Sequence, residues 1–182
     1  MYITNSHICM IISPITTVVK NIMAMPYYKN AASASGITFS AHELAITDKL
    51  CEHGYSSWNP FINMNTESKC KFRRDTQMRD WIAHPELSTV MPVGTFMEQP
   101  FGTNCAPDFY IKVSPTFVLP MEAKSVTNGY YPVWNGGGPK PGFLYVFCSK
   151  KVNKTTIFMG DSVINLEQQR LIDDHILRHR ND

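Results

Sequence analysis

Two carboxylates and one amine stand at spacings that could carry out chemistry on a phosphate. Asp108 directly precedes one apolar segment, while Glu122 and Lys124 end the next, two residues apart. If the two segments pair as a hairpin, Asp108 lies near the end of its partner strand, and Glu122 and Lys124 leave the same face. Neighbouring carboxylates repel each other, and a hard divalent cation such as Mg²⁺ relieves that repulsion while keeping water and phosphate as further ligands. With a lysine beside them to offset developing negative charge, these residues predict hydrolysis of a phosphodiester.

The same residues have a simpler interpretation. A Glu-x-Lys pattern on a strand is common, and most examples are solvated faces or cross-strand ion pairs. Two observations favour chemistry here. The apolar run from Phe117 to Leu119 precedes Glu122 and Lys124, so the charges end a buried strand, and Pro107-Asp108 stands upstream across a turn.

The flanking sequence predicts the elements that must position these residues. Ser40 and Glu43 match a capping box at the start of a helix that Gly54 ends. Apolar runs and turn residues predict the remaining elements: strands over 107–113 and 116–124 joined at Ser114-Pro115, a loop over 130–142, a buried strand over 143–148, a lysine-rich hairpin turn leading to a strand over 155–159, and a helix over 165–180. This order predicts an α/β fold with a mixed central β-sheet flanked by α-helices.

Composition limits the class of protein. The chain has 182 residues, of which 43% are hydrophobic and 12% aromatic, enough for one folded domain and too many for a disordered chain. Lys and Arg number 17 against 15 Asp and Glu, for a formal charge of +2. This balance excludes a polybasic tail as the source of function, so binding of nucleic acid would need basic residues gathered on one face. The five cysteines form no CxxC pair, which favours free thiols in a reducing compartment over disulfides or a zinc site.

The N-terminus is expected to stand apart from the domain. Residues 1–25 are predicted to form an arm of unassigned role, and residues 26–182 a single domain. The apolar run from Ile8 to Val19 is interrupted at Ser13-Pro14, is too short to span a bilayer, and has no Lys or Arg in the seven residues before it. We therefore expect a cytoplasmic protein without a membrane partner.

The pattern of residues resembles a known family. Pro107-Asp108 followed by Glu122-Ala-Lys124 resembles the signature of the PD-(D/E)xK nuclease superfamily, and the PVWNGGGPKP loop at 132–141 with the apolar strand after it resembles a group of type II restriction endonucleases. The resemblance covers roughly residues 36–165. It implies a restriction-endonuclease-like core and a Mg²⁺-dependent endonuclease that hydrolyses double-stranded DNA, with a homodimer to cut both strands of a palindrome and a cognate DNA methyltransferase in the same host.

Carried over by position, the resemblance assigns roles to individual residues. Asp108 and Glu122 would bind Mg²⁺, and Lys124 would orient the attacking water. Such nucleases often add an acid from the first helix, and Glu43 is the candidate, with the helix cap as its alternative role. Glu98 is a weaker candidate for the metal. His42 is expected to be an exposed helix residue, because the family uses no histidine for the chemistry.

Contacts with DNA are predicted from the loop and from a basic cluster. The loop over 130–142 follows the catalytic strand and should lie beside the scissile phosphate. Trp134 could stack or pack, Asn135 could bind a base edge or a backbone amide, and Lys140 could reach a phosphate. Ser125 could contact a phosphate or end the strand with a hydrogen bond. The second cluster could bind phosphates or be a solvated face: Lys69, Lys71, Arg73 and Arg74.

Other functions remain open at this point. A nicking or repair nuclease of the same superfamily is the nearest alternative. A DNA-binding module that kept the fold without catalysis is another, although such a copy would usually have lost one of Asp108, Glu122 and Lys124. A structural protein in which Glu122 and Lys124 form a surface ion pair would leave the Trp134 loop without a role.

Overall fold

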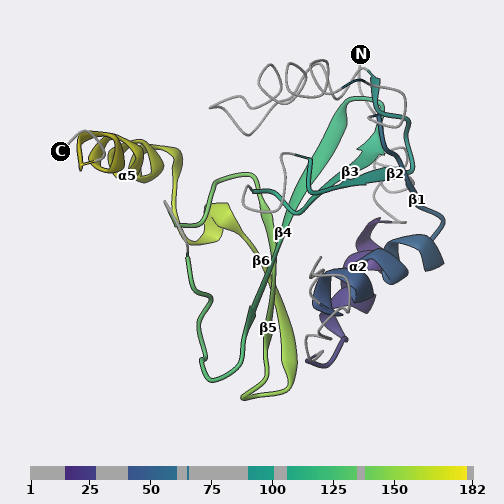
Figure 1. The fold of residues 1–182 in the computed structure, drawn as a ribbon, viewed down its shortest axis with the longest axis horizontal. Coiled ribbons are helices and arrows are strands. Elements are labelled where there is room, and N and C mark those ends of the chain that lie inside the picture. The colour runs from purple at the N-terminus through teal and green to yellow at the C-terminus, as the bar shows by residue number, and fades with distance from the viewer. Residues whose placement is uncertain are drawn as a thin grey trace, which may run out of the picture.

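A computed structural model describes residues 15–27, 41–60, 65, 90–100, 106–134 and 138–179. Its regular elements are the strands of one sheet, a helix at residues 15–23, and the helices α2 and α5 (Figure 1). The predicted strands and the C-terminal helix are confirmed to within about two residues at their ends. In chain order the elements are α2 (Ala41–Glu52), β1 (Ser56–Ser57), β2 (Thr95–Glu98), β3 (Phe109–Ser114), β4 (Phe117–Val126), β5 (Leu144–Ser149), β6 (Lys154–Met159), the short 3-10 helix η1 (Gly160–Ser162) and α5 (Leu166–His179).

The six strands form one mixed sheet in the order β1-β2-β3-β4-β5-β6. β1 runs parallel to β2, and β4 runs parallel to β5, while the other neighbours are antiparallel. β3 and β4 pair from Ser114 opposite Phe117 to Phe109 opposite Met121. In the described part of the chain, β4 then continues to Val126 with β5 as its only partner. The sheet therefore forks after Met121, at the point where Glu122 begins the unpaired edge of β4.

Helices cover one face of this sheet. α2 and a helix at residues 15–23 pack on the face that carries Phe96, Ile111, Met121 and Val146, and the core they form includes Val18, Ile22 and Met25. The predicted arm over residues 1–25 is therefore wrong for its second half, because residues 18, 22 and 25 are at most 3% exposed. Residues 1–14 lie outside the described residues.

The burial pattern of α2 explains its register on the sheet. Its buried residues are His42, Ala45, Ile46 and Leu50, which lie on one face at helical spacing. The helix ends at Glu52, and the predicted stop residue Gly54 follows it with a φ of +83° while the Tyr55 N–H donates to the Leu50 carbonyl (3.0 Å). This is the hydrogen bond of a Schellman motif, in which glycine tolerates the left-handed conformation. Ser40, the predicted N-cap, lies outside the described residues.

α5 closes the described chain and extends away from the sheet (Figure 1). It begins with a capping box: the Asn165 side chain accepts from the Gln168 N–H (2.9 Å), and the Gln168 side chain accepts from the Asn165 N–H (3.0 Å). Leu166, Leu171 and Leu177 are each more than half exposed. Neither α5 nor another helix in the described ranges is long and apolar enough to cross a membrane.

Candidate active site at the fork of the sheet

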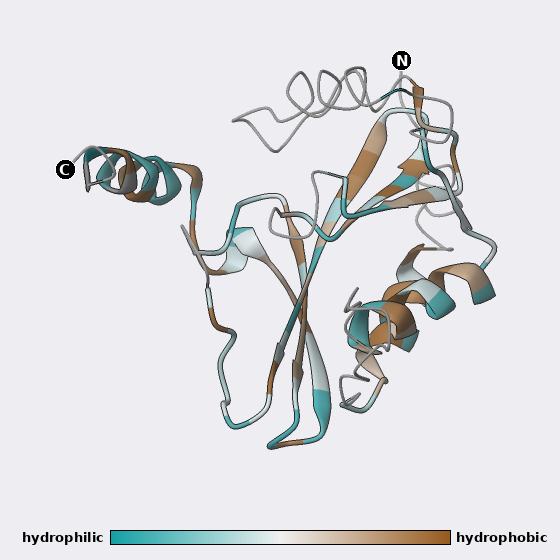
Figure 2. Ribbon diagram, in the orientation of Figure 1, coloured by the Kyte–Doolittle hydropathy of each residue, from teal (hydrophilic) through white to brown (hydrophobic). Residues whose placement is uncertain are grey.

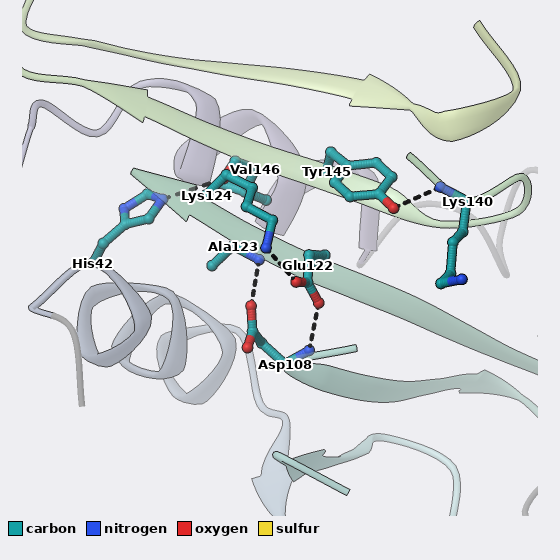
Figure 3. Close-up of polar contacts among 8 residues, drawn as sticks. All are labelled: His42, Asp108, Glu122, Ala123, Lys124, Lys140, Tyr145 and Val146. Atoms are coloured by element: carbon teal, nitrogen blue, oxygen red, sulfur yellow. Dashed lines mark hydrogen bonds and ion pairs between the residues drawn. The ribbon is translucent and has the colours of Figure 1, made fainter. Parts of the chain in front are cut away.

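The fork is closed by reciprocal hydrogen bonds between Asp108 and β4 (Figure 3). The Asp108 Oδ2 accepts from the Ala123 N–H (2.8 Å), and the Asp108 N–H donates to the Glu122 Oε2 (3.1 Å). The Ala123 amide lies on the edge of β4 that β3 has left, so the Asp108 side chain satisfies a group that a neighbouring strand would otherwise pair. This arrangement brings the two predicted carboxylates together.

Lys124 completes the predicted cluster. Its Nζ lies 2.7 Å from the Glu122 Oε1, and the side chains are 22% and 8% exposed, respectively. Glu122 and Lys124 share a face because they are two residues apart on a regular strand. A pair buried to this extent is screened less by solvent than a surface pair, and loss of one member would leave the other charge poorly compensated.

Burial and neighbouring negative charge at the fork raise the proton affinity of Asp108. Burial is the largest cause and the negative charge of Glu122 the next, and together they raise the pKa of Asp108 from 3.8 to about 8. The Ala123 hydrogen bond and the charge of Lys124 lower this pKa but do not offset the increase. Without a cation, Asp108 is therefore held mostly protonated near neutral pH.

This shift predicts how stability depends on pH in EDTA. The folded protein binds the Asp108 proton more tightly than the unfolded chain, so the free energy of unfolding should fall as pH rises from about 4 to 8. Asp108→Asn cannot ionise, and at pH 8 we expect it to raise the free energy of unfolding by about 2 kcal/mol, or ~4–8 °C in Tm. Thermal melts between pH 5 and pH 9 measure this, with Asp48→Asn, an exposed position on α2, as the matched control. An Asp108→Asn protein less stable than wild type at pH 8 would contradict the assigned electrostatics.

Glu43 lies near the two carboxylates, at the start of α2. Its charge is a further cause of the raised pKa of Asp108. Gln99 helps to hold it: the Gln99 Nε2 donates to the Glu43 Oε2 (3.4 Å), and the Gln99 N–H donates to the Asp108 carbonyl (2.7 Å). Gln99 adopts a φ of +42°, a conformation that residues other than glycine seldom take. Sequence reasoning missed Gln99, because no periodicity or motif marks it.

Glu98 and His42 lie on the side of the sheet that faces α2. The Glu98 Oε1 accepts from the Thr47 hydroxyl of α2 (2.7 Å), and Glu98 is not among the charges that act on Asp108. The prediction that His42 is exposed is wrong, since it is only 1% exposed. Its Nε2 lies 3.4 Å from the Val146 carbonyl, and burial lowers the pKa of its ring. His42 takes a core position of α2 that its residue type did not indicate.

Tyr145 forms the wall of the site on β5, and sequence reasoning did not single it out. It stands opposite Glu122 in the parallel register, and its hydroxyl accepts from the Lys140 N–H (2.7 Å). The ring of Trp134 meets it edge-on, with centroids 5.0 Å apart. Burial, with a smaller contribution from Glu122 and Asp108, raises the pKa of Tyr145, so it stays a neutral phenol. The ring contact with Trp134 and the hydrogen bond from Lys140 attach both of these residues to the sheet beside the carboxylates.

The residues predicted to contact DNA are placed differently from one another. Trp134 is half-buried against Tyr145, and Lys140 anchors the loop through its backbone. Ser125 is exposed, and by alternation along β4 it faces the side opposite Glu122 and Lys124. Five predicted contacts lie outside the described residues: Lys69, Lys71, Arg73, Arg74 and Asn135.

The oxygen donors at the fork fit a hard divalent cation. The negative charge of Glu122 adds to the effect of burial in raising the proton affinity of Asp108, and a cation between the two carboxylates would replace that proton. In the described ranges, no three His, Cys, Asp or Glu side chains gather closely enough to hold a metal ion. The protein thus offers Asp108 and Glu122 as a pair, which suits Mg²⁺, because Mg²⁺ keeps several waters and takes its remaining ligands from substrate phosphate.

Comparisons of this chain with protein-family models, with curated proteins and with solved structures found no match.

Proposed function

We propose that the protein is a Mg²⁺-dependent endonuclease that hydrolyses phosphodiester bonds of double-stranded DNA, of the type II restriction kind, on a restriction-endonuclease-like core. The observation that carries the proposal is the meeting of Asp108, Glu122 and Lys124 at the fork between β3 and β4. Two carboxylates and an ammonium held at one fork by hydrogen bonds are the groups that such hydrolysis needs. They stand in the order and spacing of the PD-(D/E)xK signature.

Each residue has a role in this proposal. Asp108 and Glu122 hold Mg²⁺, which supplies Lewis-acid polarisation of the scissile phosphate. Lys124, anchored on Glu122, orients the attacking water and offsets the negative charge that develops on the phosphate. Glu43 adds a further negative charge close to the metal, positioned by Gln99. Tyr145 keeps bulk water from the β5 side of the site, because it is only 2% exposed.

The wider assignments belong to the same proposal and are supported by the sequence resemblance. They comprise a homodimer that cuts both strands of a palindrome, a cytoplasmic location and a partner methyltransferase that protects host DNA. Asn135, Lys140, Arg73 and Arg74 are the proposed DNA contacts, and Ser125 is not among them because it faces the side of β4 opposite Glu122 and Lys124. From its packing on Tyr145, Trp134 supports the loop that carries two of them.

Digestion of several long, unmethylated duplex DNAs tests the proposed reaction. With Mg²⁺ we expect discrete fragments with each DNA, and with EDTA none, because the carboxylate pair then lacks its cation. The measurement is gel separation of the products over time. A Mg²⁺-dependent smear or nicked circles would keep the hydrolysis and reject the restriction function in favour of a nicking or repair nuclease. Absence of cleavage by folded protein on every DNA would reject the nuclease and favour a binding module.

A further inference from the structure

A group of lysines and tyrosines lies at the end of the sheet beyond the fork. The lysine–tyrosine patch consists of Tyr130, Tyr131, Lys150, Lys151 and Lys154, from the segment that follows β4 and the turn between β5 and β6. All five are exposed, and Tyr131 is 80% exposed. Figure 1 places both segments at the same end of the sheet, and Figure 2 shows that this end of the hairpin is largely hydrophilic.

Specific contacts fix the two segments to each other. The Lys150 N–H donates to the Val126 carbonyl (3.0 Å), and the Ser149 hydroxyl donates to the Gly129 carbonyl (2.8 Å). The Lys151 Nζ lies 4.1 Å above the centre of the Tyr130 ring, within range of a cation–π interaction. The lysines and the tyrosines therefore form one surface with a defined arrangement.

The patch is a basic part of the protein surface. Residues 126–134 and 149–156 contain three lysines and no Asp or Glu. The chain as a whole is nearly balanced, with a formal charge of +2, so these segments are more basic than the chain average. Exposed lysines without acidic residues in the same segments are suited to bind a polyanion.

The register of the strands puts this charge on the same face as the site. Lys124 pairs with Phe147, and Val126 with Ser149, which in turn pairs with Lys154. Because paired residues share a face, Lys154 lies on the face of Glu122 and Lys124. Lys154 lies on the second strand from β4 and is displaced from Lys124 by two residues along the strand direction. At usual sheet spacings the two positions are about 12 Å apart, which a few nucleotides of a single strand can span.

We infer that the patch binds a single-stranded segment of the nucleic-acid substrate, with the three lysines on backbone phosphates and the Tyr131 ring stacked on an unpaired base. The inference rests on the proposed nuclease function. Lysines alone would serve a duplex equally well, but a ring as exposed as that of Tyr131 can stack on an unpaired base, whose face a duplex keeps covered by its own stacking. Such a contact would hold a strand that has opened beside the scissile phosphate.

Fluorescence anisotropy of the full chain in EDTA tests the patch without cleavage, using a labelled single strand and the same sequence as a duplex. We expect Lys150→Gln, Lys151→Gln and Lys154→Gln together to weaken single-strand binding at least about tenfold and to reduce the salt slope by ~2. The matched control removes the same charge elsewhere, through Lys20→Gln, Arg170→Gln and Arg178→Gln, all at exposed positions. Tyr131→Leu should weaken single-strand binding about tenfold and duplex binding little, whereas Tyr131→Phe, which keeps the ring, should match wild type.

The outcomes separate this inference from the proposed reaction. Equal affinities for the lysine triple variant and its control would overturn the patch, even if the protein cleaves DNA with Mg²⁺. Equal losses on single strand and duplex, with no effect of Tyr131→Leu, would overturn the single-strand assignment. Patch-dependent binding of the single strand by a protein that cuts no DNA would support the patch and reject the hydrolysis.

Discussion

Glu122→Gln is expected to reduce the rate of DNA cleavage by about 10³-fold or more, while the protein stays folded. Glu122 is a proposed metal ligand, accepts from the Asp108 N–H and pairs with Lys124. A glutamine keeps the size of the side chain and one oxygen acceptor, so the hydrogen bond to Asp108 can persist, but the charge that attracts the cation is lost. Initial rates of duplex cleavage at saturating Mg²⁺, with circular dichroism to check folding, measure the effect.

Glu98→Gln is the matched control for this change. Glu98 undergoes the same chemical replacement close to Asp108, but its carboxylate accepts from Thr47 on the helix-covered side of the sheet. We expect its cleavage rate to stay within about threefold of wild type, a change of under 1 kcal/mol in the barrier. A loss for Glu98→Gln as large as that for Glu122→Gln, or an active Glu122→Gln protein, would show that the fork is not the reactive site.

Lys124→Gln should slow cleavage by about 10² to 10³-fold while duplex DNA still binds, because its ammonium acts on the reacting phosphate rather than on the bulk of the DNA. Lys124 is within 2.7 Å of Glu122, so its loss also removes the positive charge that opposes the rise in the Asp108 pKa. We therefore expect the pH at which cleavage reaches half its maximum to move upward as well. Single-turnover rates from pH 6 to pH 10 measure both effects.

Two further variants show whether the effect of Lys124→Gln comes from the loss of positive charge at this position. Lys124→Arg keeps the charge and should recover part of the rate and the wild-type pH profile. Lys20→Gln removes one exposed lysine from the helix at residues 15–23 and should change neither. If Lys124→Gln lowers the affinity for DNA and leaves the single-turnover rate unchanged, Lys124 is a binding residue and the proposed role is wrong.

The hairpin and its carboxylates could be predicted because the information is local. The turn at Ser114-Pro115 and the apolar residues on either side fix which residues of β3 and β4 stand opposite each other. Asp108 then falls next to Glu122, and the two-residue spacing puts Lys124 on the same face. Only a few neighbouring residues decide this geometry, so the sequence contains enough to place all three.

The wall and the supports of the site depend on contacts that are distant in sequence. Tyr145 reaches Glu122 through a parallel pairing of β4 and β5 across a long connection, whose register no local turn determines. Gln99 takes its place through a left-handed backbone conformation that its residue type does not favour. Neither residue has a motif around it, which explains why sequence reasoning found the charges and missed the residues that hold them.

Helix packing gave the clearest errors. His42 is buried because α2 packs positions 42, 45, 46 and 50 against the sheet. Since histidine is polar, the sequence did not mark position 42 as part of this buried face. The helix at residues 15–23 joins the core through Val18 and Ile22, although residues 1–25 were predicted to form an arm. A helix of this kind becomes recognisable only when the sheet face it covers is known.

Iron-directed cleavage of the protein chain measures whether a divalent cation binds between Asp108 and Glu122, as proposed. Fe²⁺ takes the place of Mg²⁺, and ascorbate with peroxide then generates radicals that cut the backbone near the bound ion. We expect cuts close to Asp108 and Glu122 that excess Mg²⁺ suppresses and that are absent from Glu122→Gln. Cuts elsewhere that Mg²⁺ suppresses, or no Mg²⁺-sensitive cut in wild type, would contradict the proposed cation site.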